Sequence, residues 1–241
     1  TAVVGASGSG KSLLAHGILG ILPYNASVSG RIYYEGRELD DPLRRHIVGT
    51  EVALVPQSVS CLDPLMQVGE QVRNGKKSPS ARERCRSLLN RYGLGKEVES
   101  QYPFELSGGM ARRVLISTAL METPKLVIAD EPTPGLHLAA AKRVLGHFRE
   151  IADQGAGVLL ITHDLELALE VADRIAVFYA GTTVEEMPAE HFQKEGLLLH
   201  PYSQALYRAM PEHGFQALPG VQPYVTERGP GCVFAARCPH G

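Results

Sequence analysis

The stretch Gly5-Ala6-Ser7-Gly8-Ser9-Gly10-Lys11-Ser12 matches the pattern G-x-x-x-x-G-K-[ST] at every fixed position. An apolar run over 1–4 precedes it and an apolar-periodic segment follows it, which is the strand, loop and helix setting that a phosphate-binding loop requires. Glycines let the backbone point successive N–H groups at phosphate oxygens, and the dipole of the following helix favours negative charge there. A glycine-rich turn that merely joins strand to helix is the alternative. We expect this stretch to bind a nucleotide triphosphate.

This motif assigns roles to single residues. Lys11 would reach the β- and γ-phosphates, and the Ser12 hydroxyl would ligate Mg²⁺. The residues expected to contact the nucleotide in this loop are Gly5, Ser7, Gly8, Ser9, Gly10, Lys11 and Ser12.

Composition places the chain among ordinary globular proteins. Its 241 residues are 44% hydrophobic and 21% charged, and the formal net charge of −2 gives no basic field that would argue for nucleic acid as the main partner. No apolar run approaches the roughly 18 to 20 residues of a membrane-spanning helix. No secretory signal is visible and the cysteines number only four, so a reducing cytoplasm is expected. The chain begins almost inside the predicted strand and ends on Cys238-Pro239-His240-Gly241, so both ends look cut.

Two adjacent carboxylates follow a second buried strand. The apolar run over 126–129 ends in Asp130 and Glu131. Such an uninterrupted run belongs to a parallel sheet covered on both faces, and the carboxyl ends of its strands are where α/β sheets bind ligands. Asp130 can hold Mg²⁺, and Glu131 can orient an attacking water or accept its proton. A charged start of a loop is the alternative.

Polar residues follow two further predicted strands. Gln57 comes directly after the strand and proline at 52–56, and His163 comes after the strand at 158–162. His163 could contact the γ-phosphate or the attacking water. The alternatives are a solvated loop glutamine and a histidine that caps a helix or fills a turn.

A second possible anion site lies at Ser107-Gly108-Gly109, just before a helix predicted from Ala111 to about Met121. The first N–H groups of a helix have no partners within it and can bind an anion. Ser-Gly-Gly is also a common helix cap and turn, so the pattern alone leaves both interpretations open.

The predicted elements alternate between buried strands and amphipathic helices, which favours a doubly wound α/β core. A loop over 58–68 carries few charges, which suits a contact surface as well as a turn. The remaining predicted elements are strands at 31–36 and 175–179 and helices at 80–92, 138–151 and 165–172.

Along the chain the motifs follow in the order phosphate loop, Gln57, Leu106-Ser107-Gly108-Gly109-Met110, the strand ending in Asp130-Glu131, and His163-Asp164. In that order they resemble the ATP-binding subunit of an ATP-binding-cassette (ABC) transporter, over nearly the whole chain. The resemblance implies an α/β P-loop NTPase fold of the ABC-ATPase type, with a parallel-sheet core, a helical signature subdomain and a small C-terminal extension. Two such subunits would face each other head to tail, with ATP between the phosphate loop of one and Ser107, Gly108 and Gly109 of the other. The implied catalytic residues are Glu131, His163 and Gln57, and the implied Mg²⁺ ligands are Ser12, Gln57 and Asp130.

The resemblance also divides the chain. The implied parts are 1–71, the first part of the ATP-binding core without its N-terminal strands; 72–121, the helical subdomain with the signature; 122–181, the second part of the core; and 182–241, the C-terminal extension.

The C-terminal extension is similar to the tail of dipeptide, oligopeptide and nickel importers. The similarity lies in His200-Pro201-Tyr202-Ser203-Gln204-Ala205-Leu206 and in 231–239. Met110, Leu62-Asp63-Pro64 and Gly69-Glu70-Gln71 also look like that group. Peptide import is the expected function, with nickel or another metal chelate as the second candidate.

Three departures from the family stand out. His137 occupies a position where the family usually has an aspartate, so communication between two ATP sites could be asymmetric. The aromatic residue that stacks on adenine would lie upstream of residue 1. Cys232 and Cys238 are too few for the four thiolates of an iron-sulfur cluster, and Cys61 and Cys85 lie elsewhere, which favours free thiols.

The resemblance implies that MgATP closes the dimer and that hydrolysis reopens it. The implied partners are transmembrane permease subunits, a second ATPase subunit that is identical or different, and, indirectly, an extracytoplasmic substrate-binding protein; nucleic acid is not expected. The implied location is peripheral, on the cytoplasmic face of the inner membrane. The rivals are a soluble ABC-type ATPase of DNA repair or translation, for which a coiled-coil insertion or a second cassette would be expected, and a catalytically impaired regulatory cassette.

Overall fold

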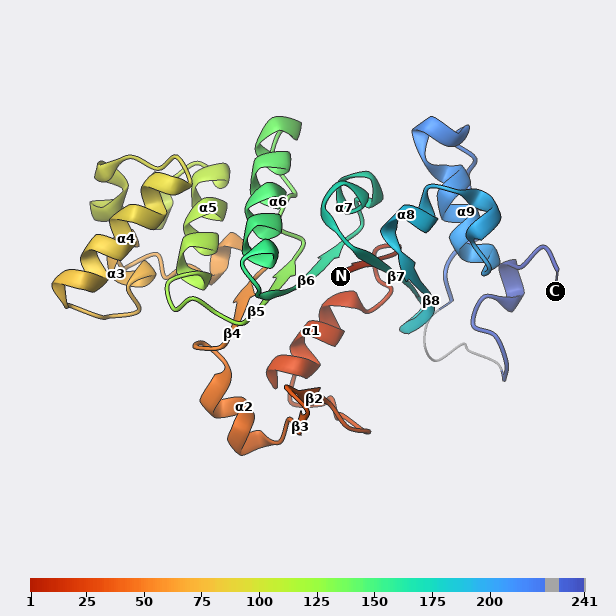
Figure 1. The fold of residues 1–241 in the computed structure, drawn as a ribbon, viewed down its shortest axis with the longest axis horizontal. Coiled ribbons are helices and arrows are strands. Elements are labelled where there is room, and N and C mark those ends of the chain that lie inside the picture. Colours follow the sequence, from red (N-terminus) through yellow and green to blue (C-terminus); the bar gives the residue numbers. More distant parts are fainter. Residues whose placement is uncertain (224–229, 241) are drawn as a thin grey trace. The chain divides into compact units, whose positions relative to one another are not determined.

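The computed structural model describes residues 1–223 and 230–240 and divides into two compact units, which Figure 1 colours along the sequence. The first unit combines 1–26 with 159–241, and the second is 27–158. The part of the predicted C-terminal extension at 224–229, with Gly241, lies outside the described residues.

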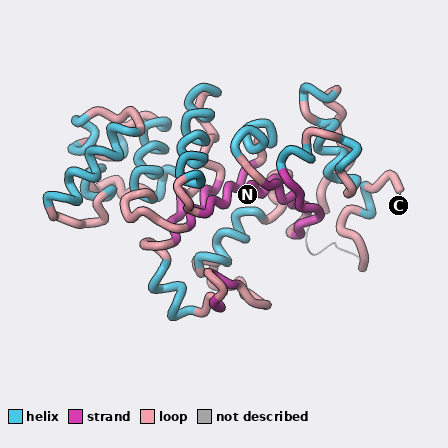
Figure 2. Tube along the Cα trace, viewed as in Figure 1, coloured by secondary structure: helices cyan, strands magenta, loops and turns pink. Residues whose placement is uncertain are grey.

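A sheet built around β1 (Ala2–Val4) forms the centre of the first unit. This strand pairs in parallel with β6 (Gly157–Thr162) on one side and β7 (Arg174–Tyr179) on the other. Both faces of these strands are covered, which explains why their sequences are apolar runs rather than alternating ones. β8 (Thr182–Pro188), which the sequence did not predict, pairs antiparallel with β7. Figure 2 shows the strands in magenta.

The described residues of the first unit contain four α-helices beside this sheet: α1 (Lys11–Leu19), α7 (Leu165–Val171), α8 (Ala189–Phe192) and α9 (Pro201–Ala209). The α7 helix begins where Asp164 accepts a hydrogen bond from the Leu167 N–H at 3.0 Å, so the residue after His163 is a helix cap.

The second unit contains a parallel pair of strands, β4 (Val52–Val55) and β5 (Leu126–Asp130). A short hairpin joins β2 (Tyr33–Tyr34) to β3 (Arg37–Glu38). The predicted strand at 31–36 is therefore too long. It stops at Tyr34 because Glu35 and Gly36 both adopt left-handed backbone angles, with φ of 48° and 75°, and reverse the chain in a tight turn.

Five α-helices belong to the second unit: α2 (Asp41–Ile47), α3 (Val68–Val72), α4 (Pro79–Arg91), α5 (Gly108–Ala119) and α6 (Leu138–Asp153). Of these, α3, α4 and α5 pack against one another, as their ribbons in Figure 1 show. The α5 helix begins at Gly108 rather than at the predicted Ala111, because Ser107 caps it.

Short 3₁₀ segments complete the described part of the chain: Val59–Cys61, Lys96–Ser100, Pro103–Glu105, Glu195–Leu197, Pro211–His213 and Ala235–Arg237. Within the described ranges, every helix is too short or too polar to cross a membrane.

Candidate functional site

The predicted phosphate loop occupies the turn between β1 and α1. Gly8 and Gly10 have φ of 77° and 96°, a left-handed conformation that glycine adopts without strain. Gly10 is the residue at which the loop passes into the helix, and Lys11 is the first helical residue. The strand, loop and helix setting expected from the motif is confirmed.

The start of this loop lies directly against β7. A Cβ atom placed on Gly5 would be 2.1 Å from the carbonyl oxygen of Phe178, a distance at which backbone would have to move. Further along, the Ser9 carbonyl accepts a hydrogen bond of 2.7 Å from the Gly181 N–H. The loop therefore rests on the end of β7 and on the turn that follows it.

Two polar side chains are buried in this loop. Lys11 is 5% exposed, and its Nζ donates to the carbonyl oxygens of Gly5 at 2.9 Å and Ala6 at 3.1 Å. Ser9 is 2% exposed, and its Oγ has no hydrogen-bond partner among the described residues. A buried hydroxyl without a partner is costly. A buried lysine and an unpartnered buried hydroxyl within one loop therefore fit a loop that binds the oxygens of an anion.

His163 lies at the same edge of the sheet as this loop. β1 and β6 run in parallel with Val4 opposite Thr162, so Gly5 and His163 each follow the last residue of neighbouring strands. His163 is exposed. The structure thus brings His163 and the phosphate loop, which the sequence could only place at the ends of separate strands, to one edge of the first unit.

The second unit contains a corresponding strand edge. Val55 of β4 lies opposite Ala129 of β5, so Gln57 and the two carboxylates leave neighbouring strands side by side. Asp130 is 3% and Glu131 7% exposed, whereas Gln57 is exposed. Glu131 adopts a left-handed φ of 47°, which costs a residue with a side chain about 1 to 2 kcal/mol. The chain turns sharply at this carboxylate, and its surroundings must hold it there.

Arg112 is the residue that ties this edge to α5, and the sequence analysis missed it. Its guanidinium is buried and donates to the carbonyl oxygens of Gln57 at 2.6 Å, Glu131 at 3.2 Å and Pro56 at 3.3 Å. Burial lowers the pKa of Arg112, and the charge of Glu131 opposes that shift. The sequence gives only a weak signal for a buried Arg112. It lies one turn before the buried Ile116 and therefore on the same side of the helix.

The predicted signature of the helical subdomain, Ser107-Gly108-Gly109, forms the beginning of α5. Ser107 Oγ accepts from the Met110 N–H at 3.3 Å, so the serine is the helix cap that the sequence left open as an alternative. A cavity opens beside Ser107 and Gly109. Arginines and histidines contribute to its lining: Arg113, Arg143, His137 and His147. Arg113 already donates to the carbonyl oxygens of Tyr92, Gly93 and Gly109, so Arg143 is the arginine of this lining that suits a negatively charged group next to the first turn of the helix.

His137, the departure from the family, caps α6. Its Nδ1 accepts from the Ala140 N–H at 3.4 Å. An aspartate side chain at this position would also cap the helix. The histidine therefore preserves the start of α6, but it lacks the carboxylate that the family usually has here.

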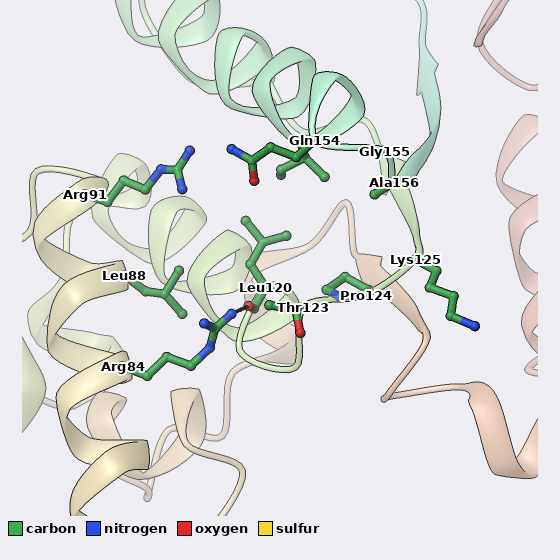
Figure 3. A pocket seen from close by; sticks show the side chains of 11 residues that line it. Arg84, Leu88, Arg91, Leu120, Thr123, Pro124, Lys125, Gln154, Gly155 and Ala156 are labelled. Atoms are coloured by element: carbon green, nitrogen blue, oxygen red, sulfur yellow. Dashed lines mark hydrogen bonds between the residues drawn. The ribbon is translucent and has the colours of Figure 1, made fainter.

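A second pocket among α4, α5 and α6 contains none of the predicted site residues (Figure 3). Its basic side chains already have partners. Arg84 donates to the carbonyl oxygens of Leu120 and Met121 at 2.9 and 2.6 Å, Arg91 pairs with Glu150, and Lys125 with Glu51. This pocket is therefore a poor candidate for an anion site.

The cysteines Cys61, Cys85, Cys232 and Cys238 are free thiols. In the part of the chain that the structure describes, no group of three or more histidines, cysteines and acidic residues is arranged to hold a metal ion.

Comparisons with known proteins show which families and structures the chain is similar to. The ABC transporter family matches residues 1–134, and the oligopeptide/dipeptide transporter C-terminal region matches 184–241. The dipeptide transport ATP-binding protein DppD of Escherichia coli is 37% identical over 260 residues, which cover 99% of this chain and 78% of that protein. The oligopeptide transport ATP-binding protein AppD of Bacillus subtilis is 35% identical over 258 residues, with 99% and 78% covered.

Solved structures resemble the fold. A dimeric ATP-binding cassette in a post-hydrolysis state, bound to ADP and Pi, superposes with a TM-score of 0.68 at 27% identity, covering 78% of this chain and 84% of that one. The ATP-binding subunit of an ABC transporter gives a TM-score of 0.67 at 28% identity, with 81% of each chain covered.

Two glycine substitutions should differ in their effect on stability. Gly5→Ala places a methyl group against the Phe178 carbonyl and should lower the free energy of unfolding by about 3 kcal/mol. Gly8→Ala meets open space and should cost only the left-handed backbone, about 1 to 2 kcal/mol. Urea unfolding measures both. Equal losses would mean that the close approach to β7 does not constrain the loop.

Replacing Arg112 with methionine should lower the free energy of unfolding by about 3 kcal/mol, because three carbonyl oxygens lose a charged donor. ATP turnover should fall as well, since the backbone of Gln57 and Glu131 is released. Arg82→Met, at an exposed position of α4, is the matched control and should change neither quantity. An Arg112 variant as active and stable as the control would contradict the role assigned to this side chain.

Proposed function

The chain belongs to the ABC transporter family, and from that membership we propose that it is the ATP-hydrolysing subunit of an importer that takes up peptides. The predicted fold class and the resemblance to these ATP-binding subunits are confirmed. The match of 184–241 to the oligopeptide/dipeptide transporter region, with relatives named for dipeptide and oligopeptide transport, supports peptides as the cargo.

The observation that carries the ATPase assignment is the phosphate loop. Its start is fixed against Phe178, its lysine is buried with the ammonium on loop carbonyls, and Ser9 Oγ has no partner among the described residues. These features fit the phosphates of ATP. We assign nucleotide contacts to the seven loop residues named above.

Catalysis by such a site consists of positioning and of stabilising charge around the γ-phosphoryl group. Lys11 would neutralise the β- and γ-phosphates. Glu131, whose carboxylate is buried at the end of β5, would orient the attacking water and accept its proton. His163 would contact the γ-phosphate or that water.

The residues predicted to bind Mg²⁺ have ligand atoms that suit this ion. The Ser12 hydroxyl, the Gln57 amide and the Asp130 carboxylate all present oxygen, the ligand atom that Mg²⁺ prefers, and Asp130 is almost fully buried at a strand end. A bound Mg²⁺ would neutralise charge on the phosphates. The side chain of Gln57 would bind the ion, while its backbone carbonyl oxygen accepts a hydrogen bond from Arg112.

The beginning of α5 supports a second subunit as partner. Ser107, Gly108 and Gly109 would bind the phosphates of ATP held by the opposite subunit, arranged head to tail. The cavity beside them, to which Arg143 contributes a guanidinium, suits that negative charge. The loss of an acidic group at His137 fits a pair of unequal subunits as well as a pair of identical ones.

The loop after Gln57 is the proposed contact with the transmembrane permease subunits. Gln71 fixes this loop, because its Oε1 accepts from the Asp63 N–H at 2.8 Å and its Nε2 donates to the Met66 carbonyl at 2.7 Å. Leu65 between them is 86% exposed. An exposed leucine on a loop that is held in place suits contact with a protein partner. Binding to permease subunits would place the chain at the periphery of the membrane, on its cytoplasmic face.

The helical subdomain at 72–121 would carry the signature between the two parts of the core. A soluble ATPase of DNA repair or translation is less consistent with the match of the C-terminal region. A silent regulatory cassette is less consistent with the presence of Lys11, Asp130, Glu131 and His163 together.

The function as a whole is tested with the chain assembled in lipid with its permease subunits and a second ATPase subunit. Hydrolysis stimulated by a peptide-loaded binding protein would support peptide import. Stimulation by a nickel-loaded binding protein alone would move the cargo to metal chelates. Bound ATP without hydrolysis in any combination would overturn the ATPase role.

Glu131→Gln should keep ATP binding and lower turnover by about 100-fold or more, because the amide cannot accept the proton of water. The exposed Glu190→Gln is the control and should retain the parent rate. Steady-state hydrolysis and a nucleotide-binding titration measure the two effects. Parent-like turnover in the Glu131 variant would remove this residue from the catalytic set.

Lys11→Ala should weaken ATP binding by about 10- to 100-fold, the worth of one charge-assisted contact with phosphate. Lys77→Ala, at an exposed position, is the control for loss of a positive charge. Calorimetric titration with ATP measures both variants. Undiminished affinity after the Lys11 change would count against the loop as the phosphate site.

A further inference from the structure

The C-terminal extension contacts the phosphate loop through one side chain. The N–H of Ala6 donates to the hydroxyl of Tyr202 at 3.3 Å, although the two residues are 196 positions apart in the sequence. Tyr202 is 2% exposed, and burial raises the pKa of its hydroxyl, so the group stays neutral. Both residues belong to the first unit.

Aromatic packing holds the Tyr202 ring in place. Its centroid lies 4.5 Å from that of Tyr179 and 5.4 Å from that of Phe234, and these two rings lie 5.2 Å apart edge to face. All three side chains are at most 2% exposed. Offset and edge-to-face pairs of this kind favour defined orientations, so the Tyr202 hydroxyl has a fixed position rather than a range of rotamers.

The residues before Tyr202 set the direction of its helix. His200 Nδ1 accepts from the Tyr202 N–H at 3.1 Å and so caps α9, and Pro201 occupies a first-turn position where no N–H is needed. The Glu185 carboxylate accepts from the N–H groups of Leu199 at 2.8 Å and His200 at 3.0 Å. Burial lowers the pKa of His200, which keeps the imidazole neutral and able to accept.

Arg237 fastens the last described segment to the same ring cluster. Its guanidinium lies 5.9 Å from the Tyr179 ring centroid and donates to the Tyr179 hydroxyl at 3.4 Å. It also donates to the carbonyl oxygens of Pro219 at 2.9 Å and Leu218 at 3.2 Å. The segments at 200–206 and 231–239, which the ATPase chemistry leaves without a role, thus both hold the cluster that contains Tyr202.

The contact at Ala6 bears on the lysine of the loop. Lys11 Nζ donates to the carbonyl oxygens of Gly5 and Ala6, so the peptide groups around Ala6 fix the ammonium. A shift of the Ala6 backbone would therefore move the charge that faces the phosphates.

We propose that Tyr202 is a positioning residue of the ATP site, whose hydroxyl holds the Ala6 amide and thereby the carbonyl oxygens that orient Lys11. This inference rests on the proposed function, since it takes the loop to be the ATP site. The His-Pro-Tyr segment and the tail around Phe234 and Arg237 are the framework that presents this hydroxyl. Tyr202 acts through the loop and does not touch the nucleotide.

Tyr202→Phe removes the hydroxyl and keeps the ring. The dissociation constant for MgATP and the KM for hydrolysis should each rise about 3- to 10-fold, the equivalent of one neutral hydrogen bond, while kcat stays near the parent value. Calorimetric titration of the full chain, well below its unfolding temperature, gives the affinity and, from the stoichiometry, the fraction of folded protein. Hydrolysis by the assembled transporter gives the KM and kcat.

Tyr207→Phe is the matched control, because this tyrosine lies on the same helix and its ring stacks on His213, with centroids 3.9 Å apart. It should leave affinity, KM and kcat at parent values. Equal effects of the two tyrosine changes would overturn the proposal, as would a Tyr202 variant whose stoichiometry falls while the affinity of its folded fraction is unchanged.

Lys11→Ala separates this inference from the proposed function. If that change weakens MgATP binding while Tyr202→Phe leaves affinity and KM unaltered, the ATP site stands and the role of Tyr202 is refuted. If Lys11→Ala also has no effect, the assignment of the ATP site itself fails.

Discussion

The structure depends on a close approach between two backbones, where Gly5 begins the phosphate loop against the carbonyl of Phe178. No side chain fits there, since a Cβ would lie 2.1 Å from that oxygen. The parallel register of β1 and β7, with Val4 opposite Val177, brings these two backbones together independently of the side chains of the loop. A site that stabilises charge on phosphate is effective when its donors are fixed in advance, and at the proposed phosphate site the sheet would fix them.

Local patterns in the sequence were enough to find the loop, most of the buried strands and the long helices, because each depends on neighbours along the chain. They did not find β8, since Thr182–Pro188 has neither an apolar run nor strict alternation and is a strand only because it pairs with β7. The contacts that Arg112 and Tyr202 make could not be predicted for the same reason. Their partners lie 55 and 196 positions away, and only the fold brings them together.

In the second unit, α5 contains both the predicted signature and Arg112, which the sequence did not connect with each other. The α5 helix starts at the predicted signature, and one turn later Arg112 binds the carbonyl oxygens of Gln57 and Glu131. A rotation of α5 would therefore displace the backbone of Gln57 and of Glu131 together. Glu131 is also held at a left-handed φ of 47°, so its position responds to the partners that maintain that strain.

Successive side chains of a strand point to opposite faces, so β7 contacts both the phosphate loop and the C-terminal tail. Phe178 approaches the loop glycines, with its ring 3.7 Å from the place of a Cβ on Gly10, whereas the next residue, Tyr179, packs in the aromatic cluster of the tail. A bulge against β8 at Val177 and Phe178 adds local twist at this point. Because the two residues are covalent neighbours, a tail that shifts Tyr179 also shifts the support of the loop. The C-terminal region is thus built onto the strand that supports the proposed ATP site.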